Sequence, residues 1–419
     1  MDEMTLGNGL KLIGEHLPHF HSVTVGIWLG VGSQHEEASE AGLSHFLEHM
    51  LFKGTARRTA KQIAQEMDAV GGQINAFTSK ECTCYYAKVI DEHLPLAMDV
   101  LCDMVRNATI APGDLGREKG VIIEEISMVE DTPEDIVHDL LNLAWFGGQP
   151  LGRPILGTAE LVRAYKADDL KTYRKRMYRP DNAVIAIAGN YNWAAFCELA
   201  SALMGDWPRG EGDIPGWPDN PACGQLLYKE KDIEQTHICV GLPGVAQISE
   251  GVYPLSVFNN LFGGAMSSRL FQRIREEKGM AYAVYSYPTP YVNCGLFTIY
   301  AGTSPQNARQ VLELIRDEID VIKRDGPGME EVNQAREQLK GSFILSLESA
   351  SGKMHSLGRR KLLFGDVRRE EQVLASINAV SYEDVERVMR LVFSGPCALS
   401  LVGPDVATLD TGMFIPVHP

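Results

Sequence analysis

The sequence predicts an α+β fold made of two homologous halves, each a mostly antiparallel β-sheet with helices packed on one face. Three observations support this prediction. Residues 205–224, near the midpoint of the 419-residue chain, are dense in glycine and proline, as expected of a linker. The same order of strand-like and helix-like segments occurs on both sides of that segment. Matched segments in the two halves are separated by nearly constant distances along the chain.

The first half contains strand-like and helix-like segments in a defined order. Apolar alternation and β-prone residues predict strands over residues 10–14, 23–29, 73–78 and 82–89. Helical periodicity predicts helices over 44–53, 59–70 and 94–106, and another from 112 to about 130. Thr59 and Gln62 have capping-box spacing at the start of the second helix, and Gly71-Gly72 follows its end.

The second half repeats this order. Strands are predicted over residues 238–242, 281–287 and 295–301, and helices over 253–261, 267–277, 305–323 and from 327 onward. Matching Ala97-x-x-Val100-Leu101 to Ala308-x-x-Val311-Leu312 gives an offset of 211 residues, and the two Pro-Gly pairs give 215. This agreement indicates an ancient duplication. We therefore predict an N-terminal domain over 1–210, a linker over 211–224 and a C-terminal domain over 225–419.

Composition excludes several classes of protein. The hydrophobic fraction of 45% and the charged fraction of 22% are typical of globular domains. A formal charge of −16 argues against nucleic-acid binding, because phosphate affinity requires a basic face. No apolar run reaches the roughly 20 residues of a membrane span, and the acidic N-terminus does not resemble a secretory signal. We therefore expect a cytoplasmic protein that binds neither nucleic acid nor membranes.

The most informative local motif is His45-Phe46-Leu47-Glu48-His49. On a helix, residues i and i+4 share a face, so both imidazoles can bind one metal ion. Glu48 lies on the same side, where it could act as a base toward water. This is the inverted form of the HExxH arrangement. Alternatively, the two histidines lie on an ordinary solvated helix face.

A third ligand is expected from the helix that begins at Pro112. Glu118 and Glu125 are two helical turns apart and share a stripe interrupted by apolar residues. Carboxylates on a stripe that should be buried need a partner, and a metal site would supply one. A solvated acidic face is the alternative. Glu124 points about 100° away and is the weaker candidate.

Taken together, these motifs resemble the inverted-zincin family of pitrilysin, insulinase and mitochondrial processing peptidase. The resemblance covers nearly the whole chain. It includes the segments Gly42–Met50, Lys53-Gly54-Thr55, Gly72-x-x-Asn75-Ala76-x-Thr78, Glu118-x6-Glu125 and Ser268-Arg269-Leu270-Phe271. The family has a glutamate about 76 residues after the second histidine, which selects Glu125 over Glu124.

The resemblance implies a zinc endopeptidase with one Zn²⁺ per chain. By this resemblance His45, His49 and Glu125 are the zinc ligands, and Glu48 is the general base. Glu118 matches the family's supporting carboxylate, which orients the site from outside the ligand set. A metal-activated water would attack the scissile carbonyl, and Glu48 would pass its proton to the leaving amine.

The resemblance also implies how a peptide substrate binds. The strand over 73–78 matches the family's edge strand, to which substrate adds as one more strand beside Asn75, Ala76 and Phe77. Without the resemblance, an ordinary sheet strand is the simpler interpretation. Arg275 and Tyr282 resemble the family's arginine–tyrosine pair near the scissile bond, where Tyr282 would stabilise the oxyanion. A solvated arginine and a strand tyrosine are the alternative.

The second half has no equivalent metal set. At an offset of 211 or 215, positions 45, 48 and 49 correspond to Ser256, Asn259, Asn260, Gly263 and Gly264, and Glu125 corresponds to Arg336 or Lys340. Relatives of this length pair to enclose a chamber, so we predict a homodimer in which Arg275 and Tyr282 of one protomer face the zinc of the other.

One departure from the family pattern limits the resemblance, and two other functions remain open. The segment 261–267 is short, whereas the non-catalytic subunit of mitochondrial processing peptidase has a long glycine-rich loop there. Presequence sensing by such a loop is therefore not expected. A non-catalytic scaffold, like the core subunits of respiratory complexes with this fold, is the main alternative, although such subunits usually have eroded metal motifs. A zinc lyase acting on a small molecule is a third possibility and would need neither the edge strand nor the Arg/Tyr pair.

Overall fold

The computed structural model describes residues 1–210, 212 and 216–414. The predicted linker therefore falls partly outside the described residues, at 211 and 213–215. The chain divides into two compact units. Unit 1 comprises residues 1–126, 154–218 and 345–367, and unit 2 comprises residues 127–153, 219–344 and 368–419.

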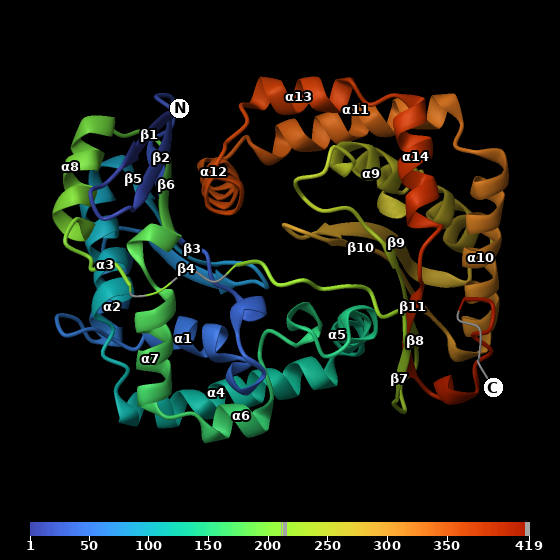
Figure 1. Cartoon of the computed structure of the whole chain (residues 1–419), viewed down its shortest axis with the longest axis horizontal. Helices are drawn as coiled ribbons and strands as arrows, with labels where there is room; N and C mark the ends of the chain where they lie inside the picture. Colours follow the sequence, from blue (N-terminus) through green and yellow to red (C-terminus); the bar gives the residue numbers. More distant parts are fainter. Residues whose placement is uncertain (211, 213–215, 415–419) are drawn as a thin grey trace. The chain divides into compact units, whose positions relative to one another are not determined.

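Unit 1 is built on a six-stranded sheet. Its strands, in the order in which they pair, are β1 (Asp2–Thr5), β2 (Lys11–His16), β6 (Ala183–Gly189), β3 (Ser22–Leu29), β5 (Thr83–Ile90) and β4 (Gln73–Thr78). Only the β2–β6 pair is parallel. Among the described residues, strand β4 pairs with β5 alone and forms an edge of the sheet (Figure 1). The sheet is therefore mostly antiparallel, as the sequence predicts.

The main core of unit 1 lies on one face of this sheet. Val23, Val25 and Ile27 of β3 point into it and join Phe46 and Leu101, all fully buried. The helices of this unit are α1 (Leu43–Leu51), α2 (Ala60–Asp68), α3 (Leu94–Asn107), the first part of α4 (Pro112–Asp131), α6 (Ala159–Ala164), α7 (Ala167–Met177), α8 (Trp193–Met204) and α12 (Ala350–Phe364).

The opposite face of the first sheet is covered by α12, which belongs to the second half of the sequence (Figure 1). The Trp28 indole N–H donates to the Met354 sulfur over 3.4 Å. Gly358 allows this close approach, since a Cβ at that position would lie 2.1 Å from the Trp28 indole nitrogen. The sequence predicts helices on one face only; α12 is an addition on the other face.

Unit 2 repeats the strand order of unit 1. Its sheet runs β7 (Leu226–Glu230), β11 (Ala398–Gly403), β8 (Thr236–Pro243), β10 (Gly295–Thr303) and β9 (Ala281–Pro290), with only β7–β11 parallel. This order matches β2-β6-β3-β5-β4 strand for strand. The shared topology supports the duplication inferred from the sequence offsets.

The helices of unit 2 also come from both halves of the chain. They are α5 (Pro133–Phe146), α9 (Val252–Asn259), α10 (Ala308–Asp325), α11 (Met329–Ser346, nearly all in this unit), α13 (Glu370–Asn378) and α14 (Tyr382–Val392), with π-helical turns at Asn260–Gly264 and Phe271–Glu277. Helix α5, from the first half, packs against β11 and β8, where the Ser400 hydroxyl donates to the Val137 carbonyl over 2.7 Å. Each half of the sequence thus contributes one helix to the other unit.

Candidate metal centre

Helix α1 carries the two histidines, and a buried carboxylate holds its first turn. Glu36 is 3% exposed; its Oε2 accepts the amide of Gly42 over 2.9 Å, and its Oε1 accepts the amide of Ser44 over 2.6 Å. These two amides belong to the unpaired donors at a helix N-terminus. Gly42, at φ 93°, takes the left-handed conformation that turns the chain into the helix. Glu36 therefore holds the N-terminal end of α1, next to His45, in place.

The donor atoms of the predicted ligands converge on one point. His45 Nε2 lies 3.2 Å from His49 Nε2, and Glu125 Oε2 lies 3.6 Å and 3.5 Å from these two nitrogens. Zinc with bonds of about 2.0–2.1 Å in tetrahedral geometry places its donors about 3.3 Å apart. The triangle of two imidazoles and one carboxylate therefore fits a zinc ion. Within the described part of the chain, these three residues form the single group of His, Cys, Asp and Glu side chains arranged to hold a metal.

Glu118 supports this centre from behind His49. Its Oε1 lies 2.9 Å from His49 Nδ1, and its Oε2 lies 2.6 Å from the Lys53 ammonium. A carboxylate on Nδ1 keeps the proton there and leaves Nε2 free to bind a metal. Burial acts to lower the pKa of His49, but hydrogen bonds with Glu125 and Glu118 outweigh this effect, and the pKa is raised. Glu118 itself is only 4% exposed, so the predicted stripe is buried at this position.

His45 differs from His49 in its surroundings. Burial, reinforced by the nearby His49, lowers the pKa of His45 to about 4. Its imidazole is therefore neutral at pH 7, the form that binds a metal. Its Nδ1 is buried and has no hydrogen-bond partner among the described residues.

Glu48 lies between the metal triangle and the edge strand. Its Oε2 accepts the hydroxyl of Thr78, at the end of β4, over 2.5 Å. Burial raises the pKa of Glu48, and the hydrogen bond from Thr78 opposes part of this rise. A carboxylate with a raised pKa is a better proton acceptor, which suits a general base.

The predicted substrate strand has a free edge. Asn75, Ala76 and Phe77 lie in β4, which in the described part of the chain pairs with β5 on one side and with no strand on the other. The Ala76 amide donates to the side-chain oxygen of its neighbour Asn75 over 2.8 Å, which places this N–H on the open side of the strand. An added strand would find this donor there.

The structure also brings Arg275 and Tyr282 together, within unit 2. The Arg275 guanidinium lies 4.9 Å from the centre of the Tyr282 ring and 4.8 Å from that of Phe271. Tyr282 is 78% exposed at the start of the edge strand β9. The pair is therefore open to a ligand, and its role in catalysis stays a prediction.

Comparison with known proteins identifies the family. Residues 11–159 match the family model of insulinase (peptidase family M16), and residues 164–339 match that of the peptidase M16 inactive domain. The chain belongs to the M16 peptidase family. The second match agrees with the absence of a metal set from the described part of unit 2. The family and fold class predicted from the sequence are thus confirmed.

M16 relatives cover almost the whole chain. An uncharacterized zinc protease of Bacillus subtilis, YmxG, is 44% identical, with 96% of this chain and 98% of that protein covered. An uncharacterized zinc protease of Streptomyces coelicolor is 42% identical, with 96% and 89% covered. Both relatives are named zinc proteases, which agrees with the finding that the three donor atoms of this chain fit a zinc ion.

Solved structures support the fold alone. A protease from Helicobacter pylori has a TM-score of 0.90 at 21% identity, covering 96% of this chain and 99% of that one. A chain of complex III2 from Candida albicans, with Inz-5 bound, has a TM-score of 0.85 at 21% identity, covering 98% and 97%. No helix in the described residues has the length and apolarity needed to span a membrane.

Sequence reasoning did not assign roles to three residues that shape this site. Glu36 holds the start of α1, Lys53 pairs with Glu118, and Thr78 holds Glu48. Lys53 and Thr78 both occur in motifs that carry the family resemblance, so their positions were available in the sequence. Glu36 lies in no such motif, and its contact with the backbone of α1 gives no sequence pattern.

Proposed function

We propose that this protein is a zinc-dependent endopeptidase that cleaves short or unfolded peptides bound as an added β-strand. The observation that carries the proposal is the triangle of His45 Nε2, His49 Nε2 and Glu125 Oε2 with Glu48 on the same helix. Zinc held by these three ligands would act as a Lewis acid that polarises the scissile carbonyl and lowers the pKa of water.

The residues of the chain would perform the proton transfers. Glu48 would take a proton from the attacking water and later deliver it to the leaving amide nitrogen. Thr78 occupies Oε2 of Glu48 and so fixes the carboxylate, leaving Oε1 to carry the proton. Asn75, Ala76 and Phe77 would hold the substrate backbone along β4, while Tyr282 would donate to the oxyanion and Arg275 would hold the peptide.

Metal analysis and a peptidase assay test this function. Purified protein should contain about one zinc per chain and cleave an internally quenched peptide library. A chelator should abolish cleavage, and added zinc should restore it. Protein that contains no zinc, or whose cleavage is unchanged by the chelator, would contradict the proposal.

A second candidate is a non-catalytic core subunit of a larger assembly. The similarity to a chain of complex III2 supports it at the level of fold. The complete donor triangle favours the peptidase, because a scaffold has no need of converging ligand atoms. Stable zinc-free protein without peptidase activity would favour the scaffold.

We further propose that the active form is a homodimer enclosing a chamber, in which Arg275 and Tyr282 of one protomer serve the zinc of the other. Mixing two inactive variants tests this arrangement. Glu48→Gln lacks the base, and Tyr282→Phe lacks the oxyanion donor. In a mixed dimer, one site would combine an intact base with an intact tyrosine, so activity should return. If the pair acts within its own protomer, mixing would restore nothing.

A further inference from the structure

A cationic cavity of about 850 Å³ lies in unit 1. It is formed by the end of α3, by α7 and the residue after it, and by residues 207–210. These three segments are far apart in the sequence, and none of the metal-centre residues lines the cavity. Its volume falls within the range typical of small-molecule sites. Its six cationic residues are Arg106, Lys171, Arg174, Lys175, Arg176 and Arg209.

None of the described residues that line this cavity is a carboxylate, although the chain carries a formal charge of −16. Two of the cations are paired with acids elsewhere: Arg106 lies 2.8 Å from Asp206, and Arg176 lies 2.7 Å from Glu40. Of the remaining four, Arg209 lies close enough to Asp181 to help lower the pKa of that carboxyl. Lys171, Arg174 and Lys175 have no carboxylate ion-pair partner among the described residues. The cavity therefore concentrates uncompensated positive charge.

Arg174 shows why this charge needs a partner. Its guanidinium is partly buried and donates to the Ala108 carbonyl over 2.6 Å. Burial lowers its pKa, but an arginine remains protonated at any physiological pH. A partly buried cation that meets only neutral groups loses hydration without a compensating charge. A bound anion would supply that charge.

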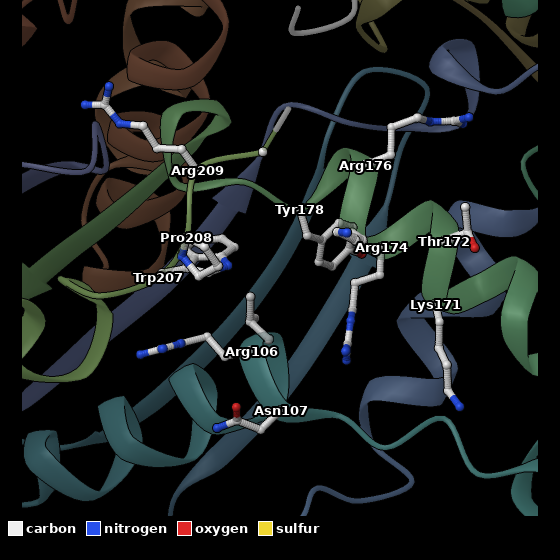
Figure 2. Close-up of a pocket in the computed structure, with 13 residues that line it drawn as sticks. Arg106, Asn107, Lys171, Thr172, Arg174, Arg176, Tyr178, Trp207, Pro208 and Arg209 are labelled. Carbon is white, nitrogen blue, oxygen red and sulfur yellow. The ribbon is translucent and has the colours of Figure 1, made fainter. Parts of the chain in front are cut away.

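Several of the side chains are already held in place. Arg106 donates to the Leu203 carbonyl, and Arg209 donates to the Gly7 and Asn8 carbonyls over 2.9 Å. Figure 2 shows Arg174 and Lys171 extending from their helix in the same direction. The ordering entropy of anion binding would therefore fall mainly on the exposed Lys171 and Lys175 rather than on the arginines.

We propose that this cavity binds a small ligand that carries two or more phosphate groups. Arginine forks match phosphate oxygens in bidentate geometry, and lysines add point charges. Three uncompensated cations suit the charge of a diphosphate or triphosphate better than that of a singly charged anion. Peptidase activity is not required for this site, so the two proposals can fail separately.

Calorimetric titration of the full-length protein tests the site. Inorganic pyrophosphate and a nucleoside diphosphate are titrated at fixed ionic strength in a phosphate-free buffer, and at least one should bind saturably with one site per chain. Lys171→Gln/Lys175→Gln removes two exposed cations, so the fold should be unaffected. We expect this variant to weaken binding at least tenfold. Comparison of the two ligands shows whether the phosphates suffice or a nucleoside adds to affinity.

A matched double variant controls for the loss of charge. Lys61→Gln/Arg163→Gln removes two exposed cations that do not line the cavity and should leave the affinity unchanged. Arg174→Gln should also weaken binding, provided that its melting temperature is that of wild type. Three outcomes would overturn the proposal. The first is that neither ligand binds, and the second is that citrate binds more tightly than pyrophosphate. The third is that the cavity variant binds as tightly as wild type, which is the result expected if pyrophosphate bound at the metal centre instead.

Discussion

The two units share one strand order, but the polar residues at corresponding helix positions make different contacts. In unit 1, α1 directs His45 and His49 toward Glu125, and the three donor atoms converge. At an offset of 211, the corresponding positions in unit 2 are Ser256, Asn259 and Asn260, each of which hydrogen-bonds a neutral neighbour. The Ser256 hydroxyl donates to the Val252 carbonyl, Asn259 accepts the Ser286 hydroxyl, and Asn260 donates to the Ala335 carbonyl.

Helix α4 of unit 1 and the corresponding helix α11 of unit 2 show the same contrast. Helix α4 presents the carboxylates Glu118 and Glu125 to the histidines. At the positions corresponding to Glu125, α11 carries Arg336 or Lys340, which bond the Val380 carbonyl and Glu337. The comparison shows that the sheet and its hydrophobic core carry the fold, while a few polar positions decide whether donor atoms converge.

The largest expected effect comes from removing the base in unit 1. Glu48→Gln should keep zinc and lower the turnover number by about 10³-fold or more, because general-base catalysis contributes about 10²–10⁴-fold. Metal analysis and a peptide assay measure the two quantities. Asn259→Asp changes the corresponding position of unit 2 and should leave turnover unchanged. Near-normal turnover by Glu48→Gln would remove the functional distinction between the units.

The next effect concerns the stability of unit 1 toward acid. Burial lowers the pKa of His35 to about 4, and its Nδ1 accepts the Gly32 amide over 3.1 Å. The unfolded chain takes up a proton as the pH falls through 6.5, but the folded chain does not until about pH 4. The contribution of His35 is therefore fully present above pH 6.5 and is lost between pH 6.5 and 4, by about 3 kcal/mol at most.

His35→Asn tests this expectation. Its side-chain oxygen can accept the Gly32 amide but does not titrate in this range. Urea unfolding at pH 7 and pH 4.5 should show a smaller loss of unfolding free energy for the variant than for wild type. An equal loss in both proteins would show that other groups cause the acid sensitivity, for example the half-buried His138 and the buried His237 of unit 2, whose pKa values burial also lowers.

A smaller effect is expected from the carboxylate behind His49. Glu118→Gln should weaken zinc binding by about 10–100-fold, as is typical when the hydrogen-bond partner of a metal-binding histidine is changed. Glu124→Gln, on the exposed side of the same helix, is the matched control and should bind zinc as wild type does. Competition with a zinc chelator of known affinity measures both. Equal affinities would show that Glu118 acts only as a buried ion-pair partner of Lys53.

Much of this architecture follows from sequence pattern. The strands over 73–78 and 295–301 and the helices over 94–106 and from 112 were predictable, because apolar periodicity reports burial against a sheet. The convergence of His45, His49 and Glu125 followed from helical spacing and the family motif. Helix α12 was not predicted as a cover for the first sheet, because its contact depends on Gly358 fitting beneath Trp28. Such an approach between residues more than 300 apart has no local signal.

The smallest effect concerns the open edge of unit 1. The Ala76 amide faces away from β5, so Ala76→Pro should remove a donor to an added strand while leaving the ladder with β5 intact. Loss of one or two backbone hydrogen bonds should raise KM by about 3–10-fold with little change in kcat. Ala76→Val keeps the amide and serves as the control. A proline variant with normal melting temperature and unchanged KM would show that peptides do not add to β4, and would leave the edge strands of the two units without a functional difference.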